Sequence, residues 1–151
     1  MDTIHFEPEV DRVDWMRRDV LFANIIINGI PLIKMVCDYE RDYVYYDSEN
    51  PSRKNGGYEH QFAEDLVSQI TDPDQRMQRE YVAVLICSCT VQECDSILVR
   101  MEETDDCVLW HDLHSLRFSI KERYHEFRSF RFDKKEFWQA VERLGSHDTE
   151  S

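Results

Sequence analysis

The sequence predicts an α+β protein: a mostly antiparallel sheet with a central meander, helices packed on one face, and a C-terminal helix. Three observations predict this class. Short runs of apolar and β-branched residues recur in the second half of the chain, three stretches carry apolar residues at helical spacing, and the last of these lies near the C-terminus. The expected order of elements is β-α-α-β-β-β-β-α.

The central strands of the meander are expected at residues 81–87 and 97–102. Residues 82–87 are all apolar, which is typical of a strand covered on both faces. In the second run Ile97, Val99 and Met101 share one side, as in a strand with one face toward a core. A turn at 103–106, a third strand from 107 and an outer strand at 130–132 complete the meander. The first strand of the chain is expected at 23–27, before the Asn28-Gly29 turn.

Helices are expected in three places. After Pro31, apolar and tyrosine residues recur every three or four positions from Leu32 to Tyr43. A second stripe runs from Phe62 to Ile70 and stops at residues 72–73, an Asp-Pro pair. In the third helix Asp133 is the expected N-cap, with a glutamate three residues later as in a capping box. Its buried side is expected to carry Phe137, Val141 and Leu144 or Trp138.

The 151 residues fit one α+β domain, which we assign to residues 23–145. Residues 1–22 are charged with scattered apolar positions and are expected to form an arm or short helix lying on that domain. Residues 47–57 are expected to form a loop, residues 111–127 show no regular period, and 146–151 form a polar tail.

Charge is the strongest global observation. The formal net charge is −13, a field that repels nucleic acid and anionic membranes and speeds encounters with basic partners. No apolar run approaches the ~20 residues of a membrane helix, and the N-terminus lacks a signal-peptide pattern. Five cysteines, three of them within eight positions, favour reduced thiols. We therefore expect a cytoplasmic protein with no nucleic-acid or membrane partner.

Three motifs together carry a resemblance. They are the stretch from Ile27 to Leu32 (I-N-G-I-P-L), the Cys-x-Cys-x4-Cys stretch of Cys87, Cys89 and Cys94 with a tryptophan sixteen residues later, and Phe130-x-Phe132-Asp133 before the last helix. The chain resembles, over roughly residues 24–144, a widespread family of small uncharacterised, mainly bacterial proteins with this order of motifs. It has Thr90 where those proteins usually have glycine, and Asp95 where they usually have tryptophan or another residue. The resemblance implies a shared fold and brings no established activity.

The cysteine stretch is the one candidate metal site. Thiolates of Cys87, Cys89 and Cys94 are ligands that zinc accepts, and a fourth ligand is available from Cys107, His111 or His114. Cys-x-Cys-x4-Cys is not a zinc-knuckle spacing, however, and cysteines on one face of a strand also pack as small hydrophobes. Packing is the favoured interpretation. Zinc binding and reversible oxidation of Cys89 with Cys94 remain alternatives.

Nothing in the sequence forms a recognisable catalytic set. Phosphate-loop, dinucleotide-binding, nucleophile-elbow and zinc-protease motifs do not occur, so we expect no enzyme and no cofactor. Residues 117–135 hold seven of the 18 lysines and arginines, interleaved with aromatic residues. We interpret these cations as partners of the protein's own acidic surface or of a second copy.

The remaining candidate is a stretch that combines acidic and tyrosine side chains, as interfaces with basic proteins do. The leading hypothesis is an immunity- or antitoxin-type inhibitor of a basic effector, such as a toxin nuclease. The alternatives are a zinc- or redox-linked protein and a self-associating, homodimeric accessory protein. The expected partner-binding residues are Asp38, Tyr39, Glu40, Asp42, Tyr43, Tyr45, Tyr46, Asp47 and Glu49.

Overall fold

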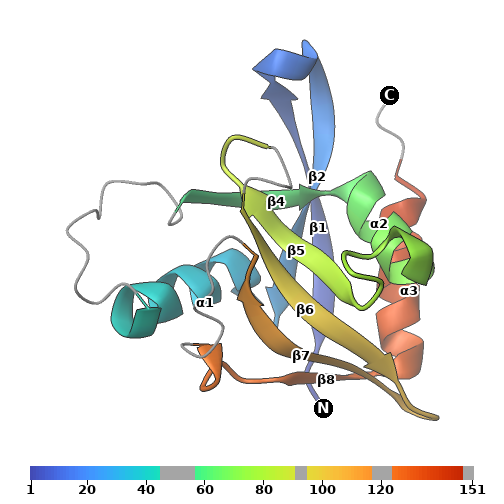
Figure 1. The fold of residues 1–151 in the computed structure, drawn as a ribbon. Helices are drawn as coiled ribbons and strands as arrows, with labels where there is room; N and C mark the ends of the chain where they lie inside the picture. The colour runs from blue at the N-terminus through green and yellow to red at the C-terminus, as the bar shows by residue number, and fades with distance from the viewer. Residues whose placement is uncertain (45–56, 91–94, 117–123, 148–151) are drawn as a thin grey trace.

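The computed structural model describes residues 1–44, 57–90, 95–116 and 124–147, and shows the expected α+β class. Within these ranges eight strands form one antiparallel sheet in the order β1-β2-β4-β5-β6-β7-β8, with β3 paired to β2 (Figure 1). The strands are β1 (Ile4–Val13), β2 (Arg18–Ile27), β3 (Ile30–Pro31), β4 (Tyr58–Phe62), β5 (Tyr81–Cys87), β6 (Ser96–Glu103), β7 (Cys107–Ser115) and β8 (Phe130–Asp133).

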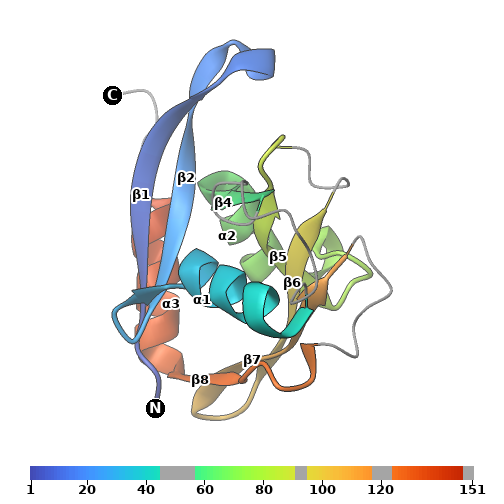
Figure 2. The same ribbon diagram turned by 90° about the vertical axis from the view of Figure 1, so that its left-hand side faces the viewer.

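In the described part of the chain three α-helices accompany the sheet: α1 (Leu32–Tyr39), α2 (Ala63–Thr71) and α3 (Lys134–Gly145). All three contribute buried residues to one core cluster that also contains side chains of the strands. Figure 1 shows α2 and α3 together at one side of the molecule, and Figure 2 shows α1 crossing its middle. No helix of the described ranges is long and apolar enough to cross a membrane.

The predictions for the second half of the chain are largely confirmed. Val82 and Val84 of β5 belong to the main core and Ala83 to a smaller cluster, so this strand is covered on both faces. Helix α3 begins as expected, because the Asp133 side chain accepts a hydrogen bond from the Glu136 amide at 3.0 Å. The predicted inner side of α3 is also buried, with Ala140 added to it.

The N-terminal region differs from the expected arm or short helix. Strands β1 and β2 pair along their whole length, from Ile4 with Ile27 to Val13 with Arg18. The far half of this hairpin projects beyond the rest of the molecule (Figure 2). Pro8 and several charged residues conceal the strand pattern of β1, but β1 lies at the sheet edge, where proline and charge are tolerated.

Three further strands differ from the sequence analysis, and the first of them, β3, is not among the expected elements. Strand β4 was not predicted, and β7 continues to Ser115 through residues expected to be irregular. Strand β4 pairs with β5 at residues 58–60 and then turns to pair with β2 at residues 61–62. The pairing of β4 with β5 ends before Ala83, and two side chains form hydrogen bonds with the Ala83 backbone. Gln61 Nε2 donates to Ala83 O at 3.0 Å, and the Ala83 amide donates to Gln69 Oε1 at 2.7 Å.

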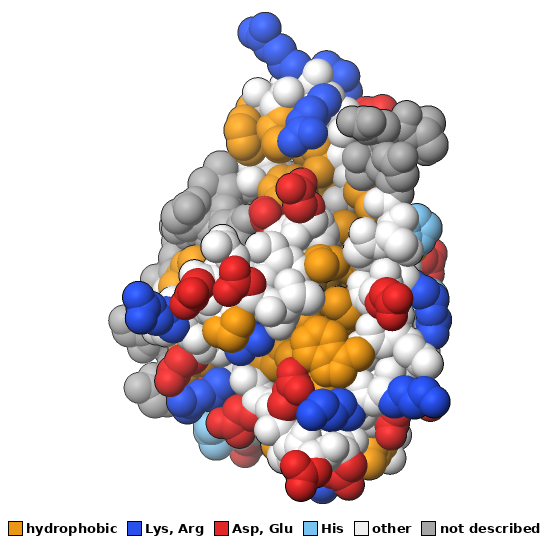
Figure 3. Space-filling model, turned by 90° about the vertical axis from the view of Figure 1, so that its right-hand side faces the viewer, with side chains coloured by type: hydrophobic (Ala, Val, Ile, Leu, Met, Phe, Trp, Pro, Cys, Tyr) orange, Lys and Arg blue, Asp and Glu red, His pale blue; other side chains and the backbone are white. Residues whose placement is uncertain are grey.

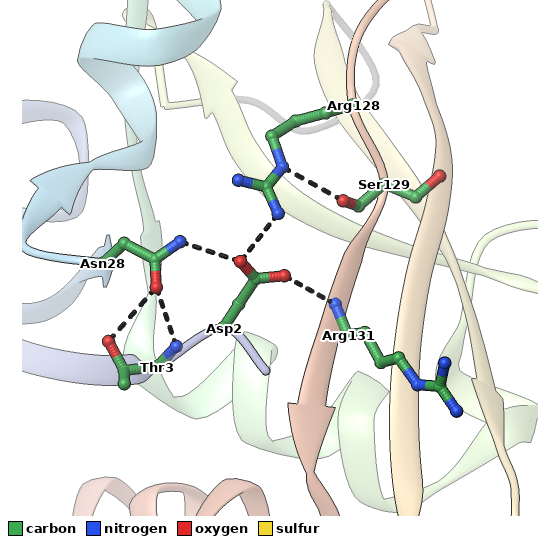
Figure 4. Close-up of polar contacts among 6 residues, drawn as sticks. All are labelled: Asp2, Thr3, Asn28, Arg128, Ser129 and Arg131. Carbon is green, nitrogen blue, oxygen red and sulfur yellow. Dashed lines mark hydrogen bonds and ion pairs between the residues drawn. The ribbon is translucent and has the colours of Figure 1, made fainter.

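The first and last strands of the sheet approach each other at the N-terminus. Asp2 forms a parallel bridge with Phe132, and its amide donates to Arg131 O at 2.8 Å. The Asp2 carboxylate accepts hydrogen bonds from Asn28 Nδ2 at 2.8 Å, Arg128 Nη2 at 2.6 Å and the Arg131 amide at 2.9 Å (Figure 4). We call this contact the closure site, because it links the chain just before β1 to the last strand of the sheet.

Candidate functional site

The predicted partner-binding stretch begins at the C-terminal end of α1. The helix ends at Tyr39 and continues as a single π-helical turn, Glu40–Val44. Asp38, Tyr39, Glu40 and Asp42 therefore lie on one continuous helical segment. The side chain of Tyr43 and all of Tyr45, Tyr46, Asp47 and Glu49 lie outside what the structure describes.

Of the three acids and one tyrosine described on this segment, Asp38 and Asp42 face solvent and carry ion pairs. The Asp38 carboxylate lies 2.6 Å from Lys34 Nζ and 3.4 Å from Arg41 Nη1, and Arg41 Nε lies 3.2 Å from Asp42. The hydrogen bond from Lys34 and the nearby positive charges lower the pKa of Asp38. Asp38 and Asp42 lie at an exposed helix end, where they form a small surface with Lys34 and Arg41 that we call the α1 end surface.

Tyr39 connects this surface to the core. Its ring stacks on Tyr124 at a centroid distance of 5.9 Å and meets Phe127 edge-on at 5.2 Å. The side chain is half-buried, in agreement with the predicted stripe of α1. These contacts hold the end of the helix against the segment that precedes β8.

Glu40 faces the interior, where it presents no charge to a partner in this conformation. It is 3% exposed, and its Oε2 accepts hydrogen bonds from the hydroxyls of both Tyr58, at 2.7 Å, and Tyr124. Glu40 follows Leu32 and Val36 by eight and four residues, so it continues their buried stripe. That spacing is the sequence signal for its burial.

Asp95 adds a second acidic side chain to this buried group. It is 8% exposed and accepts a hydrogen bond from Ser115 Oγ at 2.7 Å. Burial raises the pKa of Glu40 to about 7, the two tyrosine hydroxyls oppose that rise, and the negative charge of Asp95 adds to it. We call Glu40, Tyr58, Asp95, Ser115 and Tyr124 the buried acid cluster.

The other members of the buried acid cluster come from the ends of four strands or from the segments before them. Tyr58 begins β4, Asp95 precedes β6, Ser115 ends β7, and Tyr124 precedes β8. Burial and the charge of Glu40 raise the pKa of Tyr58, which keeps its hydroxyl protonated as a donor. Chemically, the cluster holds one carboxyl that exchanges its proton near neutral pH. Glu40, Tyr58 and Tyr124 are each at most 4% exposed. Glu40 lies on the same helical segment as Asp38 and Asp42, so its buried hydrogen bonds anchor the α1 end surface to the core.

The cysteines of the predicted metal stretch lie at the end of β5 and in the turn after it. Cys87 is half-buried, Cys89 is exposed, and Cys94 lies outside the described residues. Thr90 has φ 66°, the left-handed conformation that favours glycine, and its amide donates to Cys87 O at 2.7 Å. A tight turn thus forms with threonine at the position where the resembling family has glycine.

The candidate fourth ligands are dispersed. Cys107 is buried at the other end of the sheet, where Arg131 Nε lies 3.2 Å from its Sγ. His111 lies 3.4 Å from Glu102, and the His114 ring meets Tyr81 edge-on. Among the described residues no three His, Cys, Asp or Glu side chains converge as metal ligands. The zinc set and the Cys89–Cys94 pair depend on Cys94 and remain predictions.

Arg128 and Lys134, two cations of residues 117–135, form ion pairs with acidic residues of the same chain. This agrees with the interpretation of that segment from the sequence. Arg128 lies 2.6 Å from Asp2, and Lys134 Nζ lies 3.3 Å from Glu103. Arg128 also lies over the Phe130 ring, 4.9 Å from its centroid. Arg117, Lys121 and Arg123 lie outside the part of the chain that the structure describes.

Comparison with known proteins gives no match to a protein-family model, to a curated protein or to a solved structure. The family resemblance set out above therefore remains a prediction, and function has to be inferred from the surfaces of the chain.

Proposed function

We propose that this protein binds a basic protein partner and, in the most concrete form, acts as an immunity- or antitoxin-type inhibitor that covers a cationic effector without catalysis. The observation that carries the proposal is the α1 end surface. Asp38 and Asp42 lie there on a helix end that Tyr39 and Glu40 anchor to the core, in a chain with a net charge of −13.

The anchoring of this surface suits it to recognition. Tyr39 is packed between Tyr124 and Phe127, and Glu40 accepts two hydrogen bonds in the core, so the backbone between the two aspartates is already ordered. A partner then loses little conformational entropy in binding it. The net negative charge accelerates the approach of a basic protein, and the aspartates supply its specific contacts.

The existing ion pairs do not block such contacts. Lys34 and Arg41 are largely exposed, and exposed pairs of this kind contribute only about 0–1 kcal/mol. A lysine or arginine of a partner can therefore compete for either aspartate. Displaced Arg41 remains free to turn toward solvent.

The test is affinity capture from the lysate of the source organism, followed by identification of the captured protein and a binding titration with the purified pair. We expect a stoichiometric basic partner whose own activity falls as the complex forms. Replacing both aspartates (Asp38→Lys with Asp42→Lys) should weaken binding at least tenfold, mainly through faster dissociation.

A matched control carries the same charge change elsewhere. Asp74→Lys with Asp105→Lys alters two exposed acids in turns away from α1. This control should slow association modestly through the change in net charge and leave dissociation almost unchanged. If both double variants weaken binding equally, the α1 end surface has no specific role. A purified partner that binds the Asp38/Asp42 variant as tightly as the original protein contradicts the proposal.

A further inference from the structure

A groove lies between the projecting hairpin, the start of α2 and the end of α3. Its volume is about 560 Å³, within the range of ligand-binding clefts. Much of its lining is apolar: Trp15, Met16, Val20, Phe62, Val67 and Leu144. It lies away from the α1 end surface, on the face that α2 and α3 form (Figure 3).

The groove continues along the two helices. A second, shallower depression shares Val67 and Gly145 with it and extends to Trp138 and Val141. Figure 3 shows the result as a band of hydrophobic side chains that runs lengthwise through this face. An elongated apolar strip beside helices suits a segment of chain better than a compact small molecule.

Trp15 marks one end of the strip and is held in place despite its exposure. The residue is 62% exposed, yet its Nε1 donates a hydrogen bond to Thr90 Oγ1 at 2.6 Å. This bond joins the tip of the hairpin to the turn after β5. A fixed, exposed tryptophan is the kind of residue that contributes most to protein interfaces, because little entropy is lost when it is covered.

The charges along the strip are mainly negative. Of the described residues that line the groove, Asp19, Glu64 and Asp65 are acidic and Arg18 is the one arginine or lysine. Glu142 lines the depression near Trp138. Figure 3 shows acidic side chains on both sides of the apolar band. The chemistry that complements this arrangement is an apolar stripe flanked by lysine and arginine.

We propose that this groove binds a basic amphipathic helix of a protein partner, with the apolar stripe of that helix against Trp15 and Val67 and its cations beside the acidic rim. The inference rests on the proposed function, since the helix would belong to the same basic partner. It adds a second contact surface, and it defines the chemistry of the partner segment that fills it.

The test uses a displayed library of 15-residue peptides as the probe, selected against the whole protein. We expect the selected peptides to share apolar residues at positions i, i+3 or i+4 and i+7, with lysine or arginine between them. A synthetic peptide of this kind should bind less tightly as salt rises. Val67→Glu and Trp15→Ala should each weaken it at least tenfold.

The matched control is Ile30→Glu, which introduces the same charge at an exposed apolar residue outside the groove. It should change peptide affinity less than twofold, and circular dichroism of all variants establishes that they fold. Selected peptides without the basic amphipathic pattern, or peptides that bind the Val67 and Trp15 variants as well as the original protein, overturn the inference.

Two measurements separate this inference from the proposed function. The Asp38/Asp42 double variant should weaken peptide binding only modestly, through its change in net charge, because the α1 end surface lies outside the groove. If a basic partner binds the groove variants as tightly as the original protein, the groove inference fails and the proposed function stands. If the peptides depend on Val67 and Trp15 but no basic partner exists, the proposed function fails and the groove remains a peptide site.

Discussion

The closure site holds Asp2, and the buried acid cluster holds Glu40, among hydrogen-bond donors from distant parts of the chain, yet the pKa values of these two carboxyl groups move in opposite directions. Burial would raise the pKa of Asp2, but bonds from the Arg131 amide, Asn28 and Arg128 together lower it. Burial raises that of Glu40 to about 7, although two tyrosines donate to it.

The difference lies in charge and in depth. Asp2 has a guanidinium 2.6 Å away and a side chain that keeps 14% of its surface, so its negative charge is matched and partly hydrated. Among the described residues the donors to Glu40 are the neutral hydroxyls of two tyrosines; Glu40 also lies deeper and has Asp95 nearby. The number of hydrogen bonds alone therefore does not decide whether a buried carboxyl is ionised; a cation and access to water do.

Glu40→Gln should have the largest effect, which is a change in how the unfolding free energy depends on pH. The folded pKa of about 7 lies above the ordinary 4.5, so between these values the folded state holds a proton that the unfolded state has released. The unfolding free energy of the original protein should fall by about 3 kcal/mol as pH rises through this window. The glutamine variant should lose that slope in urea titrations from pH 4.5 to 8. An unchanged slope would show that the pH dependence does not come from the Glu40 carboxyl group.

Asp2→Ala should have the next largest effect, since it leaves the Arg128 guanidinium and two other donors without their acceptor. We expect a loss of about 2 kcal/mol at pH 7. The lowered pKa means that this stabilisation is present above the ordinary value of 3.8 and disappears as pH falls through the folded value. Denaturation at pH 7 and pH 3 measures both parts. Asp2→Asn, which keeps the shape and removes the charge, should lose less; equal losses in the two variants would show that charge is unimportant here.

Tyr58→Phe removes one donor from Glu40 and leaves Tyr124 in place. We expect a loss of about 1 kcal/mol at pH 8, where Glu40 is ionised, and a smaller loss at pH 5. Tyr81→Phe is the control, because its hydroxyl donates to the half-buried Asp112 at 2.9 Å. Chemical denaturation of both variants at the two pH values should show the stronger pH dependence for Tyr58. The reverse order would contradict the role given to burial.

Asp38→Asn should have the smallest effect, about 0.3 kcal/mol, because its ion pairs with Lys34 and Arg41 are exposed. Thermal unfolding at low and high salt is a suitable measurement, since screening should abolish even this difference. A loss above 1 kcal/mol that persists in high salt would mean that the α1 end surface contributes to the fold itself.

The features predicted from the sequence are those encoded by neighbouring residues. The stripe of α1, the Asp133 cap and the alternation in β6 depend on side chains within a few positions of each other, so periodicity reveals them. Strand β1 has only Phe6 and Val13 fully buried, and it depends on pairing with β2. Its own composition gives little sign of that pairing.

The remaining differences arise from long-range contacts and irregular backbone. The register of β6 with β7 shifts between Leu98 and Arg100, and Asp112 has φ 55°, so the alternation expected of a strand is broken after Trp110. Tyr58 and Tyr124 meet Glu40 from 18 and 84 positions away. The spacing of Glu40 after Leu32 and Val36 indicates its burial. No pattern in the sequence indicates that Tyr58 and Tyr124 donate hydrogen bonds to it.

The closure site also bears on the order of events during folding. Strands β1 and β2 meet across a short turn, but the Asp2 carboxylate and the Arg131 amide are 129 positions apart. Contacts between such distant residues form slowly, because the intervening chain must first lose entropy. On the ribosome, the hairpin can form while most of the chain is still unmade. The sheet then stays open, with its first residues in water, until β8 has been synthesised.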